Sequence, residues 1–226
     1  MSPSRPVEWH RCAGASSLIA DAARTVPRRL GCGRTLAAID ILVLCTGNQC
    51  RSPMAEALLR DRLAARGIDA TVTSAGELPG GVVASAGSVK AMRSRGLDLS
   101  EHRSRPGTVE MLESADLVLA MARRHLRTAV AMAPSTFPRT YTLKELVRRG
   151  AQHGRRRPDE TFEEWLAVLH QGRTTRDLLG DDRNDDVADP IGQPDAAYEK
   201  TAQELEHLLD VLVDLMLPAH QTRETA

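Results

Sequence analysis

The chain has 226 residues, a length that suits one sizeable domain with additions and that can bury a core. Its 30 Lys and Arg residues balance 30 Asp and Glu residues, which argues against a general nucleic-acid binder, since such a protein needs an excess of positive charge. No apolar run approaches the roughly 18 residues of a membrane span, and 4 cysteines are too few for a disulfide framework, so a reducing, cytoplasmic setting is expected.

The first segment, residues 1–38, is basic, rich in Ala, Ser and Arg, and without periodicity. It lacks the apolar core that a secretory signal carries. We therefore predict a disordered N-terminal extension or a wrongly assigned start codon, with an export signal as the minority alternative. The folded domain is expected over residues 39–217, followed by a tail at 218–226.

The first regular element is a buried strand at Ile41–Leu44, an apolar run closed by a turn signal. A helix is predicted to follow, with Ser52 as N-cap, a proline in its first position and an end at Gly67. A short strand at Ala70–Thr73 then leads into a Ser-Ala-Gly turn at 74–76. By the same signals, helices are expected at 83–95, 108–114 and 196–216, and strands at 116–121 and 140–143.

Strands that alternate with helices predict an α/β fold, a three-layer α/β/α sandwich around a four-stranded parallel sheet. Ligands of such folds bind beyond the carboxyl ends of the strands. The pattern breaks over residues 144–186, an expected insertion in which Thr161 and Glu164 form a capping box. Its arginines between 148 and 157 are expected in a solvated loop, with an acidic partner or membrane lipid as the alternative. Its GDDRNDD sequence, 180–186, is expected to be a solvated acidic turn rather than a calcium site.

The stretch CTGNQCRS, from Cys45 to Ser52, joins the first strand to the first helix. A strand, a tight loop and a helix start gather backbone N–H groups around one point, where the helix end adds partial positive charge. Arg51 supplies a planar fork that suits two oxygens of an anion, and these groups favour the thiolate of Cys45. The stretch therefore predicts transfer of a phosphoryl group or a similar oxyanion. No CxxC or zinc-type Cys/His spacing is present, so no metal site is expected.

The longer sequence LVLCTGNQCRSPMAEALL closely resembles the signature of the low-molecular-weight protein tyrosine phosphatases. That family carries its general acid in an Asp-Pro pair far downstream, and here Asp189 precedes a proline in DVADPIG, just before the last predicted helix. The resemblance runs from about residue 39 to residue 217, apart from the expected insertion. It implies the flavodoxin-like fold of that family and an enzyme that needs no cofactor.

The resemblance also implies a catalytic role for three residues. Cys45 would attack phosphorus and hold a phosphocysteine intermediate, and Asp189 would protonate the leaving oxygen and then deprotonate the water that hydrolyses the intermediate. Arg51 and the backbone amides of the loop would bind the phosphate oxygens. The phosphate-binding residues would be Thr46, Gly47, Asn48, Gln49, Cys50, Arg51 and Ser52.

A supporting network is implied as well. Asn48 matches an asparagine that holds the loop in an unusual backbone conformation, which is plausible because Asn tolerates positive φ. Ser52 matches a serine that bonds the thiolate, and Ser74 and His102 match residues that bond the loop asparagine. Independently of the resemblance, we predict that mild peroxide joins Cys45 to Cys50 in a reversible disulfide that protects the nucleophile.

The substrate is less closely specified than the reaction. Ile191 and Gly192 stand where many members place aromatic side chains that line the pocket mouth. The expectation is hydrolysis of phosphotyrosine or other aryl phosphomonoesters, on a phosphorylated protein or a small aryl phosphate, with a cognate tyrosine kinase as a candidate partner.

Two alternatives use the same scaffold. An arsenate reductase would use the thiolate on arsenate; no cysteine follows Cys50, which disfavours the thioredoxin-coupled kind and leaves a reductase that draws on a small-molecule thiol. A catalytically dead binding module is disfavoured because Cys45, Arg51, Ser52 and Asp189 are all retained.

Overall fold

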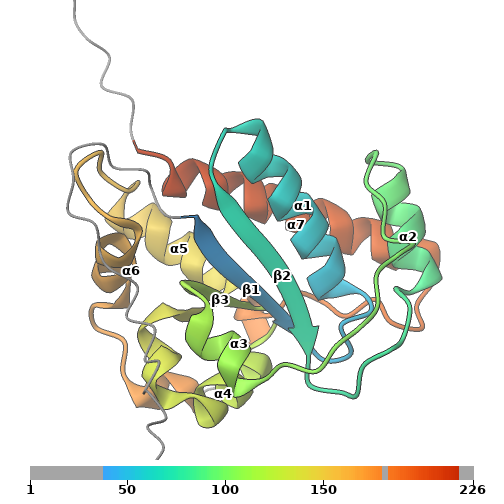
Figure 1. Cartoon of the computed structure of the whole chain (residues 1–226), viewed down its shortest axis with the longest axis horizontal. Coiled ribbons are helices and arrows are strands. Elements are labelled where there is room, and N and C mark those ends of the chain that lie inside the picture. Colours follow the sequence, from blue (N-terminus) through green and yellow to red (C-terminus); the bar gives the residue numbers. More distant parts are fainter. Residues whose placement is uncertain (1–37, 180–182, 219–226) are drawn as a thin grey trace, which may run out of the picture. The chain divides into compact units, whose positions relative to one another are not determined.

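The computed structural model describes residues 38–179 and 183–218, which belong to one compact unit, Leu36–Ala226 (Figure 1). The predicted N-terminal extension up to residue 37, the predicted tail from residue 219 and the start of the predicted acidic turn lie outside the described residues. Within the described part, no helix has both the length and the apolar composition that crossing a membrane requires.

A parallel sheet of four strands, in the order β2-β1-β3-β4, lies at the centre of this unit. β1 pairs with β2 on one side and with β3 on the other, so its carboxyl end emerges in the middle of one sheet edge. Its last residue, Cys45, lies opposite Gly76. The predicted α/β class and four-stranded parallel sheet are confirmed. The strands are β1 (Ile39–Cys45), β2 (Ala70–Gly76), β3 (Leu117–Ala120) and β4 (Thr140–Thr142).

Helices connect the strands, and their starts differ in places from the predicted ones. α1 begins at Arg51 with Cys50 as N-cap, so the prediction of Ser52 as N-cap was wrong, because the Ser52 hydroxyl bonds a sulfur atom in the site instead. α2 is shorter than predicted, because Val83 pairs with Arg103 in an isolated bridge. The helices are α1 (Arg51–Ala65), α2 (Ala86–Arg93), α3 (Val109–Ser114), α4 (Arg123–Met132), α5 (Leu143–His153), α6 (Phe162–His170) and α7 (Asp195–Met216), with short 3-10 turns η1 (Pro134–Arg139), η2 (Thr175–Leu178) and η3 (Arg183–Asp185).

The predicted Ser-Ala-Gly turn is instead the last part of β2. Ser74 pairs with Val43, and Gly76 pairs with Cys45, so β1 supplies a hydrogen-bonding neighbour up to its final residue. The chain turns only at Glu77, whose N–H donates to the carbonyl of Thr46 at 2.8 Å. The side chain of Ser74 is thereby held by a strand, beside the loop that follows β1.

The two faces of the sheet carry different helices, which makes the three-layer sandwich that the sequence predicts. Side chains alternate along a strand: Ile41 and Val43 join a large hydrophobic cluster with residues of α1, α5 and α7, whereas Leu42 and Leu44 join a smaller cluster with residues of α3 and α4. Figure 1 shows α7 as the long red helix that runs beside both α1 and α5.

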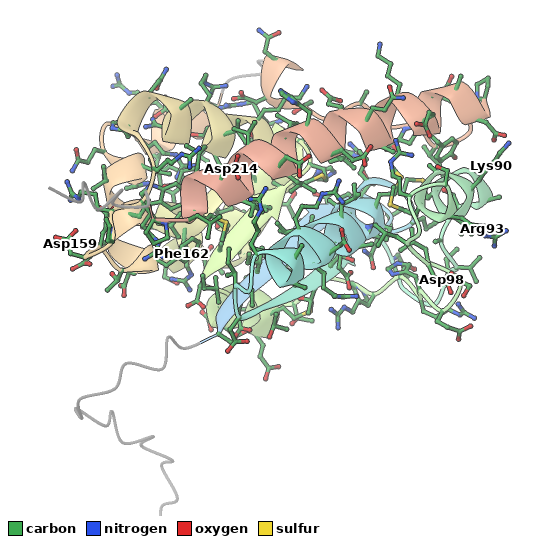
Figure 2. All side chains as sticks on the ribbon, turned by 90° about the horizontal axis from the view of Figure 1, so that it is seen from above. Lys90, Arg93, Asp98, Asp159, Phe162 and Asp214 are labelled. Carbon is green, nitrogen blue, oxygen red and sulfur yellow. The ribbon has the colours of Figure 1, made fainter. Side chains whose placement is uncertain are left out.

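Ion pairs at both ends of α7 attach it to neighbouring elements. Figure 2 shows Lys90 of α2 near one end of α7 and Asp214 near the other. Lys90 donates to Asp195, the first residue of α7, at 2.5 Å, and Arg66, just after α1, donates to Asp214 at 2.6 Å. These pairs are exposed, so each contributes little to stability.

Residues of the expected insertion form α5 and α6, and the predicted capping box at Thr161 and Glu164 is confirmed. The boundaries of the insertion stay a prediction. The prediction of a solvated loop was wrong for Arg148 and Arg149, because both lie in α5 and Arg149 donates to the carbonyl of Leu169 at 2.9 Å. It is confirmed for Arg155 and Arg157, which are exposed in the loop between α5 and α6. The prediction of a solvated acidic turn was wrong at Asp185, which is 2% exposed.

Candidate active site

The loop after β1 lies against the end of β2 and turns sharply. Asn48 has a φ of 51°, a left-handed conformation that Asn tolerates better than most residues. A Cβ at Gly76 would lie 2.7 Å from the carbonyl oxygen of Thr46, so only glycine lets the loop come this close to the strand. The loop and the first turn of α1 therefore fold back around the end of β1.

The loop folds around the sulfur of Cys45, and the whole residue is 2% exposed. The N–H of Asn48 donates to it at 3.2 Å, and the hydroxyl oxygen of Ser52 lies 2.9 Å from it. The Ser52 oxygen already accepts a hydrogen from the Asn48 side chain at 2.9 Å, so its own hydrogen is available to the sulfur. Two donors therefore face the Cys45 sulfur.

Asn48 is fully buried, and its side chain has hydrogen-bond partners at both polar atoms. Its Nδ2 also donates to Ser74 at 2.8 Å, and its Oδ1 accepts the N–H of Arg105 at 3.0 Å. The ring of His102 reaches its main-chain carbonyl at 2.7 Å. The structure thus brings together Asn48, Ser52, Ser74 and His102, and adds Arg105, which the sequence reasoning missed.

Ser74 extends this network to α1. Its hydroxyl donates to Glu56 at 2.5 Å while it accepts from Asn48. The Glu56 side chain is 18% exposed and also accepts from Arg60. Glu56 was another residue that the motif did not indicate, because its partner Ser74 lies on a different element.

The guanidinium of Arg51 lies beside the loop, with its side chain 4% exposed. It donates to the carbonyl of Val187 at 3.2 Å, to the hydroxyl of Thr46 at 3.2 Å and to Asp189 at 2.5 Å. Its Nε is buried and has no hydrogen-bond partner among the described residues. A buried cation with an unused donor is suited to an anion that accepts from it.

Asp189 reaches this guanidinium from a distant part of the chain. Its side chain is 34% exposed, so the carboxylate lies at the surface end of the site. Its second oxygen accepts the N–H of Ile191 at 3.3 Å. The two residues matched by separate motifs, Arg51 and Asp189, are therefore in direct contact.

Two cationic or titratable neighbours of the loop were not predicted. The hydroxyl of Thr46 accepts from Arg51 and from Arg124, and it lies 3.0 Å from Nε2 of His125. Both arginines donate, so the hydroxyl hydrogen goes to His125 Nε2. A sequence signal did exist: Arg124 and His125 lie in the first turn of α4, shortly after β3, whose carboxyl end lies beside that of β1.

His125 is neutral in the fold. Burial, together with the positive charges of Arg51 and Arg124, lowers the pKa of His125 to about 3. With Nε2 accepting from Thr46, the ring hydrogen is on Nδ1, which has no partner among the described residues. A cavity of about 160 Å³ adjoins the ring and is also lined by Cys45 and Glu77.

Cys50, the second cysteine of the loop, is buried and is a free thiol, as is Cys45. Its sulfur donates to the hydroxyl of Ser85 at 3.2 Å. Burial raises the pKa of the Cys50 thiol, which opposes its ionisation. Of the two cysteines, Cys45 alone receives the loop amide and the Ser52 hydroxyl.

The arrangement can hold a tetrahedral oxyanion between the loop amides and Arg51, with a sulfur at its base and a carboxyl group at its open side. Among the described residues, no group of at least three His, Cys, Asp or Glu side chains could hold a metal ion. The sulfur of Cys45, with Arg51 and Asp189 beside the loop, is suited to covalent chemistry on an anion.

Comparison with known proteins agrees with this chemistry. A family model described as low molecular weight phosphotyrosine protein phosphatase matches residues 40–164, more than half of the chain. The chain belongs to this phosphatase family.

Individual relatives include enzymes named for two different phosphorylated residues. The protein-arginine-phosphatase of Bacillus subtilis (strain 168) is 35% identical over 173 residues, which cover 76% of this chain and 92% of that protein. The crystal structure of a low molecular weight protein tyrosine phosphatase from T. tengcongensis is 35% identical, with a TM-score of 0.60, over 78% of this chain and 99% of that one. A structure of the YwlE arginine phosphatase, a cysteine-to-serine variant with a phosphorylated active-site serine, is 33% identical, with a TM-score of 0.59, over 78% of this chain and 94% of that one.

Proposed function

We propose that this phosphatase hydrolyses phosphotyrosine or other aryl phosphomonoesters through a phosphocysteine intermediate on Cys45. One observation carries the proposal: buried Arg51 has an unused Nε donor, beside a cysteine sulfur that already faces two donors. A dianionic phosphate would satisfy Arg51 and place its phosphorus next to the sulfur.

The first step forms a sulfur–phosphorus bond and breaks the bond to the leaving oxygen. The Cys45 thiolate attacks phosphorus, while Arg51 and the loop amides bind the three remaining oxygens. Asp189 donates its proton to the leaving oxygen, which departs as a neutral alcohol or phenol. For this, the Asp189 carboxyl must leave its present partner, and a phosphate that takes over the donors of Arg51 would release it.

The second step returns the enzyme to its starting state. Asp189, now ionised, accepts a proton from a water molecule whose oxygen attacks phosphorus, and the sulfur–phosphorus bond breaks. The Ser52 hydroxyl, 2.9 Å from the sulfur, would stabilise the departing thiolate. Inorganic phosphate is then released. The YwlE variant with a phosphorylated serine supports a covalent phosphoenzyme in a related site.

Phosphoarginine in proteins is the second candidate substrate. A relative that aligns with 76% of this chain is named a protein-arginine-phosphatase. In addition, the residue after the Asp-Pro pair is Ile191, which is 50% exposed, so no aromatic side chain stands at this position to stack on a phenyl ring. The same two steps would apply, with the proton of Asp189 going to the leaving nitrogen.

The substrate would be a phosphorylated protein or a small aryl phosphate, with a cognate tyrosine kinase as partner and a cytoplasmic setting. Asn48, Ser74 and His102 would hold the loop in shape, as their hydrogen bonds suggest.

Parallel rate measurements on one preparation test this function. We expect hydrolysis of p-nitrophenyl phosphate in the presence of a chelator, and no hydrolysis by Cys45→Ala. Rates on a phosphotyrosine peptide and on a phosphoarginine peptide of the same sequence decide between the two substrates. Thiol-dependent reduction of arsenate without phosphate release, or full activity of Cys45→Ala, would refute the proposal.

A further inference from the structure

The segment that carries Asp189 is attached to the site two residues earlier, at Val187, which is 1% exposed. The N–H of Val187 donates to the carbonyl of Met121, just after β3, at 2.9 Å, and its own carbonyl accepts from Arg51 at 3.2 Å. The main chain just before the candidate acid is therefore bonded both to the sheet edge and to the phosphate-binding guanidinium.

A second attachment lies two residues further back, at Asp185, whose side chain is 3% exposed. Both terminal nitrogens of Arg148, from α5, donate to its carboxylate, one of them to Oδ2 at 3.3 Å. Arg123, from α4, donates to the same Oδ2 at 3.1 Å. A carboxylate this deeply buried is tolerated only when it is paired, and here two guanidinium groups pair it.

Asp186 completes the attachment. Its Oδ1 accepts the main-chain N–H of Arg123 at 2.8 Å, an N–H that has no acceptor within its own helix because it belongs to the first residue of α4. Asp185 thus binds the side chain of Arg123, and Asp186 binds its main chain. Between the bonded residues 185–187 and Asp189, Ala188 is the single intervening residue, and its carbonyl lies 3.5 Å from the Thr201 hydroxyl of α7.

We propose that Asp185 is a positioning residue for the general acid: with Arg123 and Arg148 it anchors the segment that presents Asp189 to the leaving group. The inference rests on the proposed function, in which Asp189 is that acid. An acid must lie within hydrogen-bond reach of the atom that it protonates, and a misplacement of about 1 Å can cost on the order of 100-fold in rate. The anchor limits such misplacement when Asp189 leaves Arg51.

A double-mutant cycle separates positioning from general stability. The variants are Asp185→Asn, Asp189→Ala and the double variant, each assayed with aryl phosphates whose leaving groups differ in basicity. Asparagine keeps the shape of the side chain and removes the charge that pairs the two arginines. Asp214→Asn, which breaks an exposed ion pair at the far end of α7, is the matched control.

We expect Asp185→Asn to lower kcat about ten-fold for the most basic leaving group and less for good ones, with KM little changed. In the Asp189→Ala background the same substitution is expected to have no further effect on kcat, because no acid remains to be placed. Asp214→Asn is expected to behave as the unchanged chain.

The positioning role would be overturned if Asp185→Asn lowered kcat equally in both backgrounds or equally for all leaving groups. It would also be overturned if Asp185→Asn did not lower kcat at all. If Asp189→Ala itself shows no dependence on the leaving group, the acid assignment of the proposed function fails instead, and the positioning role fails with it. Should Asp185→Asn not fold, Arg148→Gln carries the same test, since the Arg148 side chain is 50% exposed and its loss leaves Arg123 on the carboxylate.

Discussion

Among single residues, Asn48 bonds the loop to other parts of the fold. Its left-handed φ of 51° aims its side chain at Ser52 and Ser74, and its Oδ1 accepts the N–H of Arg105. An alanine here would remove the donor to the Ser52 and Ser74 hydroxyls and the acceptor of the Arg105 N–H, and would strain the backbone. The shape of the loop after β1 therefore depends on residues of β2 and of the segment before α3, as well as on the loop itself.

The contact between Arg51 and Asp189 predicts that removing Asp189 strengthens the binding of an anion. In the present arrangement Asp189 occupies a donor of Arg51 at 2.5 Å, so a phosphate must displace it. We expect Asp189→Ala to bind inorganic phosphate about five-fold more tightly, equal to roughly 1 kcal/mol. Calorimetric titration with phosphate measures this, with Asp214→Asn as a control that leaves affinity unchanged. Equal or weaker binding by Asp189→Ala would contradict the prediction.

The low pKa of His125 predicts how the stability of the fold depends on pH. This pKa is about 3 in the fold against 6.5 for the free side chain, because burial opposes its protonation. As pH falls from 6.5 towards 3, the unfolded chain takes up a proton that the folded chain does not, so stability is lost in this window.

The free energy of unfolding is therefore expected to decrease as the pH is lowered from about 6.5. This decrease is expected to be larger in the unchanged chain than in His125→Gln, by up to about 1.4 kcal/mol per pH unit. Urea unfolding at about pH 7 and about pH 5 measures the difference between the two proteins. Identical pH dependence would show that His125 takes up its proton equally readily in the fold.

Among the helices, α7 packs so closely against α2 and α5 that a larger side chain at their contact positions would meet it. Gly87 of α2 lies so close to the ring of Tyr198 of α7 that a Cβ would overlap it. A Cβ at Gly150 of α5 would lie 2.6 Å from Cδ1 of Leu215, the far end of a flexible side chain. The two glycines therefore face a rigid neighbour and a movable one.

We expect Gly87→Ala to destabilise the fold by about 1–3 kcal/mol, because the ring cannot move without shifting the two helices. Gly150→Ala is expected to be close to neutral, since alanine favours a helix by about 1 kcal/mol over glycine and this offsets the movement of Leu215. Urea unfolding of both variants gives the comparison. Greater destabilisation by Gly150→Ala than by Gly87→Ala would contradict this view of the packing.

Buried charge also connects the elements formed by residues 144–186. Arg173, with its side chain 1% exposed, donates to Glu145 of α5 at 2.9 Å and to the carbonyl of Thr140 in β4 at 2.7 Å. Its guanidinium also lies over the ring of Tyr141, 3.9 Å from the centroid. The segment after α6 is therefore bonded to the sheet edge and is not a separate loop.

At the scale of the whole molecule, every described contact of the site comes from residues of one compact unit, Leu36–Ala226. We therefore expect a chain that starts at residue 38 to keep the kcat/KM of the full chain for p-nitrophenyl phosphate, with the same thermal midpoint. Steady-state rates and thermal unfolding of the two chains test this. A clear loss of rate in the shortened chain would show that the predicted extension takes part in function.

Much of the architecture could be predicted from the sequence, because apolar runs such as Ile41–Leu44 and the period of the last helix report burial directly. Boundaries were less predictable where a partner strand decides them, as at Ser74–Gly76, or where a side chain is used elsewhere, as at Ser52. The helix α4 was not predicted, although it carries His125.

In the site, the sequence motif identified Cys45 and Arg51, because both lie within one short loop. Asp189 could be found only through the resemblance, since no local pattern links it to Arg51 across 138 residues. Glu56 and Asp185 could not be found in this way, because each acts through a partner on another element. Such contacts depend on tertiary packing and leave no signal at a fixed spacing.

The most direct test of the account is the identity of the phosphorylated residue during turnover. The chain is mixed with an aryl phosphate, quenched within a turnover and analysed by mass spectrometry of its peptides. We expect one phosphoryl group on Cys45, in greater amount in Asp189→Ala, where hydrolysis of the intermediate is slowed, and none in Cys45→Ala. Rapid substrate hydrolysis by Cys45→Ala, or a phosphoryl group on another residue, would contradict the central claim.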